Sequence, residues 1–257
     1  MHFRQWTLLL GVATLTMTVS RAADHGTIFQ ASTISALLDG DYDGHISCGT
    51  LKTHGDFGIG TFDRLDGEMI ELDGQVYQVN AQGKVCKMPD DATLPFAAVT
   101  WFESDMTFEV AALTNFDALR AVIDQHLPSK NIFYAIRVTG EFSHVKTRSV
   151  PKQSKPYPRL AEVTKTEPVF EYGNIKGTLV GFWCPDFAQG VNVPGYHLHF
   201  LADDHSGGGH LLDCRVLKAE VSIDTTTNLY LVLPENVNAA MSTDPGKRAA
   251  ELKKAEQ

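Results

Sequence analysis

The sequence has few basic residues, and their scarcity excludes two classes of partner. The chain of 257 residues contains 22 Lys and Arg against 31 Asp and Glu, a formal net charge of −9 at pH 7. An acidic surface repels nucleic acids and anionic lipids, and basic residues gather only in the segment 152–159. We therefore expect neither a nucleic acid nor a membrane surface as a partner of the mature protein.

Long hydrophobic runs are also missing, apart from one short stretch at the N-terminus. The apolar residues 6–19 follow Arg4 and precede Ser20, Ala22 and Ala23. This order is typical of a secretory signal peptide, and the stretch is shorter than the roughly 20 residues that a membrane-spanning helix needs. We predict a signal peptide over residues 1–22, cleaved near Ala22, and export to the periplasm or the medium; an N-terminal membrane anchor is the alternative.

Cysteine is scarce, with four residues and no Cys-x-x-Cys pair. In an exported protein Cys48, Cys86, Cys184 and Cys214 could form up to two disulfides, and four cysteines allow three pairings. Free buried thiols that pack as small apolar residues are the alternative. The sequence leaves this choice open.

Repeats and low-complexity tracts are absent too, and β-forming segments dominate what remains. Asn115 is a good N-cap for a helix that ends before Pro128, a last helix is expected over about 245–256, and residues 151–159 predict a linker or a long loop. Strands are expected at 60–65, 68–72, 75–80, 84–87, 97–109, 131–145, 169–172, 174–183, 196–201, 210–220 and 228–233.

This pattern predicts an α+β fold rather than alternating βαβ units. We expect an N-terminal mixed β-sheet with helices over residues 23–160. A C-terminal β-barrel-like sheet domain, residues 161–257 with a C-terminal helix or tail, is expected to carry a metal site.

Four of the ten histidines lie within the stretch 195–214, GYHLHFLADDHSGGGHLLDC. Side chains alternate along a strand, so His197 and His199 share one face. A turn over 203–209 would return His210 opposite His199, close enough for both rings to reach one ion. Three imidazoles are a common ligand set for a catalytic zinc with open positions, the glycines 207–209 would leave room beside it, and His205 is expected to be an exposed loop residue.

Several stretches together resemble the α-acetolactate decarboxylase family. PGYHLHFL at 194–201 and GGHLLD at 208–213 look like its zinc-binding signature. The match extends, in order, over the following motifs: HGDFGIGTF at 54–62, LDGEMIELDG at 65–74, PDDATLPFA at 89–97, VKTRSVP at 145–151 and VGFWCP at 180–185.

The resemblance implies decarboxylation of (S)-2-acetolactate to (R)-acetoin and CO2 through a metal-bound enediolate, in acetoin and 2,3-butanediol biosynthesis. It implies Zn2+ as cofactor, and a homodimer joined through the N-terminal sheets. A C-terminal glutamate is expected to reach the metal, and Glu256 matches better than Glu251. The proton donor would be Glu68 or Glu256 rather than Arg148, because a guanidinium holds its proton too tightly. The implied site residues are His197, His199 and His210 on the metal, with Glu68, Arg148, Glu256 and Thr61 around it.

Two other functions share parts of this pattern. A cupin-like metal enzyme also begins with His-x-His on a strand, but it usually has a Glu where this chain has Asp203. A non-catalytic exported metal-binding protein would need further ligands to close the coordination shell.

Overall fold

The structure is a computed structural model, and it describes residues 25–235 and 245–256. The expected signal peptide, residues 1–22, lies outside this range. No helix within the described ranges is long and apolar enough to cross a membrane.

The first sheet has seven strands and is mixed, as predicted. Strand β1 runs parallel to β14, and all other neighbours are antiparallel. The Asp73-Gly74 pair forms the tight turn before β5, with positive φ at both residues (50° and 71°). The chain has a second Asp-Gly pair before β4, Asp66-Gly67, but there Asp66 has a φ of −84°. In spatial order the strands are β14 (Asn228–Val232), β1 (Thr27–Ala31), β8 (Phe96–Thr100), β3 (Phe57–Thr61), β4 (Glu68–Leu72), β5 (Gln75–Val79) and β6 (Val85–Lys87).

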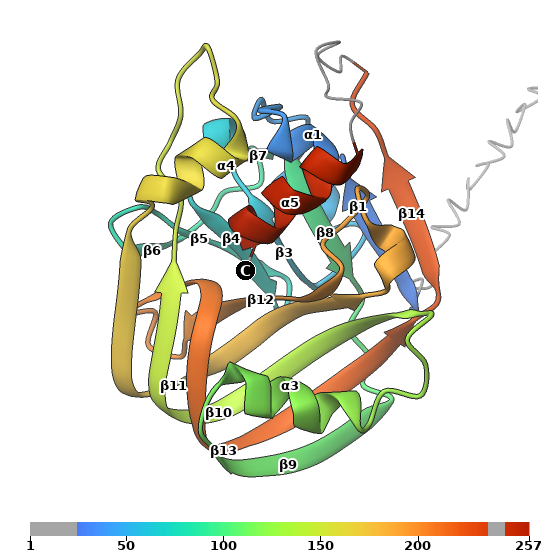
Figure 1. The fold of residues 1–257 in the computed structure, drawn as a ribbon, viewed down its shortest axis with the longest axis vertical. Coiled ribbons are helices and arrows are strands. Elements are labelled where there is room, and N and C mark those ends of the chain that lie inside the picture. The colour runs from blue at the N-terminus through green and yellow to red at the C-terminus, as the bar shows by residue number, and fades with distance from the viewer. Residues whose placement is uncertain (1–24, 236–244, 257) are drawn as a thin grey trace, which may run out of the picture.

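The second sheet closes into a barrel-like ring. Its order is β10-β11-β12-β13-β9, and β10 also pairs with β13 along most of its length. Helix α3 (Phe116–Asp124), which Asn115 caps as predicted, lies over this sheet (Figure 1). The strands are β9 (Met106–Leu113), β10 (Phe133–Arg148), β11 (Val169–Cys184), β12 (Gly195–Ala202) and β13 (Gly208–Thr226).

The two sheets pack against each other through apolar side chains. Phe57 and Ile59 of the first sheet share one buried cluster with Val180 and Phe182 of the second. A metal site on β12 can therefore be bordered by residues of the first sheet.

The remaining elements are short, and three helices gather on one side of the molecule (Figure 1). Helices α1, α4 and α5 contact one another and share an apolar cluster that includes Leu37, Leu160 and Leu252. The bounds are α1 (Ile34–Leu38), β2 (Ile46–Ser47), α2 (Cys48–Leu51), η1 (Asp63–Leu65), β7 (Thr93–Leu94), α4 (Leu160–Val163), η2 (Thr164–Thr166), η3 (Asp186–Ala188) and α5 (Pro245–Glu256).

Two expectations about the strands need correction. The segment 97–109 is not one strand: β8 ends at Thr100, and the chain crosses to the second sheet, where β9 begins. Polar contacts hold this crossing, since the Glu103 amide donates to Asp224 and the Asp105 amide donates to the Ile223 carbonyl. The segments 169–172 and 174–183 form one strand, β11, in which Asn174 has a φ of 49°.

The sheets are also not divided at residue 160. Strands β9 and β10 precede that residue but lie in the second sheet, and β14 returns to the first sheet beside β1. Long-range pairing of this kind leaves little signal in the local sequence. Whether the sheets form separable domains stays a prediction.

Candidate metal centre and active site

Three buried histidines meet where β12 and β13 pair. His199 lies opposite His210 in the ladder, as the turn over 203–209 predicted. His197 shares the face of His199, because Leu198 and Phe200 point into the core of the second sheet. One ligand nitrogen from each histidine lies within 4.8 Å of the others, so this cluster can hold a metal ion.

The orientation of His199 is fixed by a backbone group of the first sheet. Its Nδ1 lies 2.9 Å from the Met69 carbonyl oxygen, to which it donates, so the proton sits on Nδ1 and Nε2 keeps its lone pair. This Nε2 is buried, makes no hydrogen bond to a described residue, and lies 3.6 Å from Oε2 of Glu68. Two electron-rich atoms that face each other are stabilised by a cation between them, so the site fits a metal ion.

Burial keeps the imidazoles of His197 and His199 neutral. Loss of solvent lowers the pKa of His199 to about 3. It also lowers the pKa of His197 well below its ordinary value, with a smaller effect from the neighbouring His199. Neutral imidazole is the form that binds metal, and it suits zinc, copper, iron and nickel.

Glu68 and Thr61 come from the ends of two interior strands of the first sheet: Thr61 is the last residue of β3, and Glu68 is the first residue of β4. They are paired residues of β4 and β3, and both are buried. The Thr61 hydroxyl donates to the Gly67 carbonyl over 2.8 Å, which fixes the turn that precedes Glu68. Both side chains line the cavity that the histidines share.

Arg148 ends β10 directly opposite His210 in the ladder. Its Nη1 donates to Oε1 of Glu167 over 2.8 Å in a buried ion pair, and its Nη2 donates to the Ala255 carbonyl at the end of α5. Burial raises the pKa of Glu167, and Arg148 opposes that rise. Sequence reasoning missed Glu167, because Thr-Glu-Pro at 166–168 indicates only an ordinary polar loop.

The wall of the cavity away from the polar groups is apolar. Helix α5 reaches the cavity at Ala255, and Figure 1 shows the end of this helix near β4 and β12. The apolar lining residues are Ile34, Leu37, Leu65, Phe96, Val150 and Leu160. A small molecule with both methyl and polar groups suits this division of the cavity.

The C-terminal glutamates are placed differently. Glu251 accepts a hydrogen bond from Arg159 at 2.5 Å and is not among the residues that line the cavity. Glu256 is the last residue of α5 and follows Ala255, but its side chain lies outside the described part of the structure. That Glu256 rather than Glu251 reaches the metal therefore stays a prediction.

The turn between β12 and β13 departs from expectation in one respect. His205 is exposed and lies against the Tyr77 ring, with 4.7 Å between ring centroids, so it is a loop residue as predicted. The glycines make room for protein atoms: a Cβ at Gly207 would lie 2.3 Å from Tyr172, and one at Gly209 2.4 Å from the Arg148 carbonyl oxygen. Clearance beside a metal is therefore not their principal role.

The four cysteines are all unpaired. Cys48, Cys184 and Cys214 are buried, and Cys86 is half-buried. Burial raises the pKa of Cys48 to about 11, so this thiol packs as an uncharged apolar group.

Comparison with known proteins gives a consistent result. Residues 28–241 match the family model for alpha-acetolactate decarboxylase. The chain is 50% identical over 207 residues to the alpha-acetolactate decarboxylase of Methanosarcina mazei, covering 80% of this chain and 72% of the relative. It is 49% identical over 208 residues to that of Methylococcus capsulatus, covering 81% and 80%.

A solved structure agrees with these sequence matches. The crystal structure of alpha-acetolactate decarboxylase from Bacillus subtilis strain 168 superposes with a TM-score of 0.87 at 39% identity, covering 90% of this chain and 99% of that one. The chain belongs to the alpha-acetolactate decarboxylase family.

Proposed function

We propose that this chain is a zinc-dependent carboxy-lyase that converts (S)-2-acetolactate to (R)-acetoin and CO2, in acetoin and 2,3-butanediol biosynthesis. One observation carries the proposal: a buried cluster of three histidines lines a small cavity together with Glu68 and Arg148 in a chain of this family. Family membership does not favour a cupin-like enzyme or a non-catalytic metal-binding protein.

His197, His199 and His210 would hold the zinc ion. Zinc bound there would supply Lewis-acid chemistry, drawing electrons from the ketone and hydroxyl oxygens of the substrate as CO2 leaves. The residues of the chain bind, orient and protonate the substrate around that centre.

Arg148 orients the substrate carboxylate. A guanidinium has five N–H donors, and the contacts with Glu167 and the Ala255 carbonyl use only part of them. The remaining donors bind the carboxylate beside the histidines, and the apolar wall receives the methyl groups.

Glu68 supplies the proton that completes the reaction. Loss of CO2 leaves an electron pair on the carbon next to the ketone, delocalised as an enediolate. Glu68 is buried and lines the cavity, so it protonates one face of that carbon and gives a single acetoin enantiomer. A carboxyl group suits this role better than Arg148, whose proton is held too tightly.

Export and pairing belong to the same proposal. The mature chain would begin near Ala22 in the periplasm or the medium and would form a homodimer through its first sheet. Cell fractionation with N-terminal sequencing tests the first point, and light scattering of the purified protein tests the second.

The activity test combines metal analysis with a colour assay for acetoin. We expect about one zinc per chain and acetoin formed from half of a racemic acetolactate sample. Zinc-loaded protein that forms no acetoin would refute the decarboxylase function. Full activity of His199→Ala would remove the three-histidine site from the proposal.

A further inference from the structure

Four charged residues form a cluster outside the cavity, and the reaction as proposed does not use them. Nη2 of Arg159 lies 2.6 Å from Asp39 and 2.5 Å from Glu251. Nη2 of Arg248 lies 2.9 Å from the other carboxylate oxygen of Asp39. The Asp39 side chain is only 6% exposed, so its two arginine contacts are little weakened by solvent.

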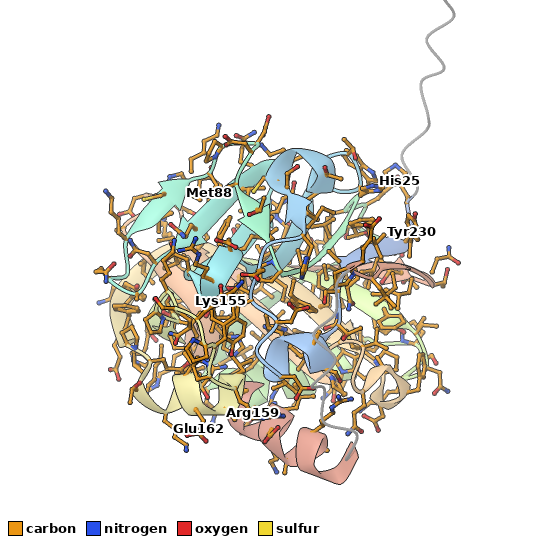
Figure 2. All side chains as sticks on the ribbon, turned by 90° about the horizontal axis from the view of Figure 1, so that it is seen from above. His25, Met88, Lys155, Arg159, Glu162 and Tyr230 are labelled. Carbon is orange, nitrogen blue, oxygen red and sulfur yellow. The ribbon has the colours of Figure 1, made fainter. Side chains whose placement is uncertain are left out.

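This cluster joins the three helices on one side of the molecule. Asp39 is the C-cap residue of α1, Arg159 is the N-cap residue of α4, and Arg248 and Glu251 lie on α5. Figure 2 shows Arg159 where these helices come together.

The same three helices contribute to the apolar lining of the cavity. Leu37 of α1, Leu160 of α4 and Ala255 of α5 all line it. The charged cluster thus sets the relative positions of the elements that close the site.

Helix α5 needs tertiary contacts of this kind to stay in place. It has 12 residues, and an isolated helix of that length is marginal in water. Of its side chains that the structure describes, only Leu252 and Ala255 are buried. The Ala255 carbonyl accepts a hydrogen bond from Arg148, so a displacement of α5 would disturb a residue of the site.

We propose that Asp39 is a positioning residue for the reaction: through Arg159 and Arg248 it docks α5, whose C-terminal end closes the cavity and supports Arg148. This inference rests on the proposed decarboxylase function. Asp39 touches none of the reacting groups, and it acts by holding three helices in one arrangement.

The test compares Asp39→Asn and Arg248→Gln with the parent by hydrogen exchange and by steady-state kinetics. We expect the α5 amides to exchange at least tenfold faster in both variants, with the second sheet unchanged. We expect kcat to fall roughly tenfold with a smaller change in KM, because misplacement of Arg148 impairs orientation more than binding. Arg248→Lys keeps the charge and should restore most of both properties.

Glu141→Gln is the matched control. Glu141 of β10 pairs with Lys176 of β11 at 2.6 Å on the surface of the second sheet, and both side chains are more than half exposed. This variant should match the parent in exchange and in kinetics.

The outcomes separate the alternatives. Faster exchange over the whole chain, unchanged exchange of α5, or fast α5 exchange with unchanged kcat would each overturn the positioning role. If Asp39→Asn does not fold, the test relies on Arg248→Gln, because Arg248 is partly exposed and its substitution should allow folding. If the zinc-loaded parent forms no acetoin, the proposed function fails, and the exchange data still decide whether Asp39 docks α5.

Discussion

His199 of β12 lies directly opposite His210 of β13, with 5.4 Å between the ring centroids. The ladder between these strands ends at this pair, and His210 pairs on its other side with Arg148 of β10. The histidine cluster thus forms where β12 leaves β13, and the ladder of the barrel-like sheet places a cationic residue beside it.

Metal removal should destabilise the protein. A ligand at about a thousand times its Kd contributes roughly 4 kcal/mol of stability, or about 8–16 °C in Tm for a chain of this size. We expect dialysis against a chelator to lower the Tm by a similar amount, and we expect added zinc to restore it, both measured by calorimetry.

His205→Ala provides the control for this measurement. His205 lies in the turn and outside the histidine cluster, so the zinc-dependent rise in Tm should persist in that variant. The same rise in His199→Ala would show that zinc binds elsewhere.

Glu68→Gln should lose most of the activity while keeping the metal. A positioned proton donor contributes about 10²- to 10⁴-fold, and glutamine has nearly the same shape without the acidic proton. Steady-state kinetics and metal analysis of the same sample test this. Glu71→Gln is the matched control, since Glu71 lies on the same strand and does not line the cavity; a kcat loss below tenfold in Glu68→Gln would exclude Glu68 as the donor.

Local pattern was enough to predict that the three histidines come together. Alternation along β12 and the glycine-rich turn place His197, His199 and His210 together, and both features arise within fifteen residues of sequence. Strand β4 and helix α3 were also predicted from local signals, namely a run of β-forming residues for the strand and the N-cap Asn115 for the helix.

Features that depend on long-range contacts could not be predicted in this way. Glu167 meets Arg148 through the β10–β11 hairpin, and Asp39 meets Arg248 across more than two hundred residues. The packing of whole helices and strands determines which charged residues meet. The local sequence around a charged residue in a loop does not show which residue it will contact. The split of 97–109 into two sheets has the same origin, because β propensity does not say which sheet a strand joins.

Glu71 should make stability depend on pH. It is fully buried, neither carboxylate oxygen has a hydrogen-bond partner in the described structure, and burial raises its pKa to about 8 despite the opposing charge of Lys52. The folded protein keeps the proton while the unfolded chain releases it near pH 4.5, so stability falls between pH 4.5 and 8 by about 1.4 kcal/mol per unit.

Glu71→Gln removes this dependence, because its side chain is neutral at every pH. We expect the free energy of unfolding, measured in urea, to be the same for the variant and the parent near pH 4.5. At pH 8.5 we expect that of the variant to be higher by a few kcal/mol. Glu109→Gln changes a strongly exposed side chain, and its free energy of unfolding should equal that of the parent at both pH values. If the stability of Glu71→Gln and that of the parent change with pH in the same way, groups other than Glu71 cause the pH dependence.

The buried pair of Arg148 and Glu167 should show strong coupling in stability. Both side chains are less than 10% exposed, so Arg148→Met leaves a buried carboxyl group without its cation, which typically costs about 3–5 kcal/mol. Adding Glu167→Gln removes the buried charge, and we expect the double variant to recover at least about 1 kcal/mol, measured as a double-mutant cycle in urea. The exposed pair of Lys218 and Glu109, 3.0 Å apart, should give a coupling below about 1 kcal/mol. Additive losses at Arg148 and Glu167 would mean that the guanidinium is held mainly by the Ala255 carbonyl, and that Glu167 does not position it.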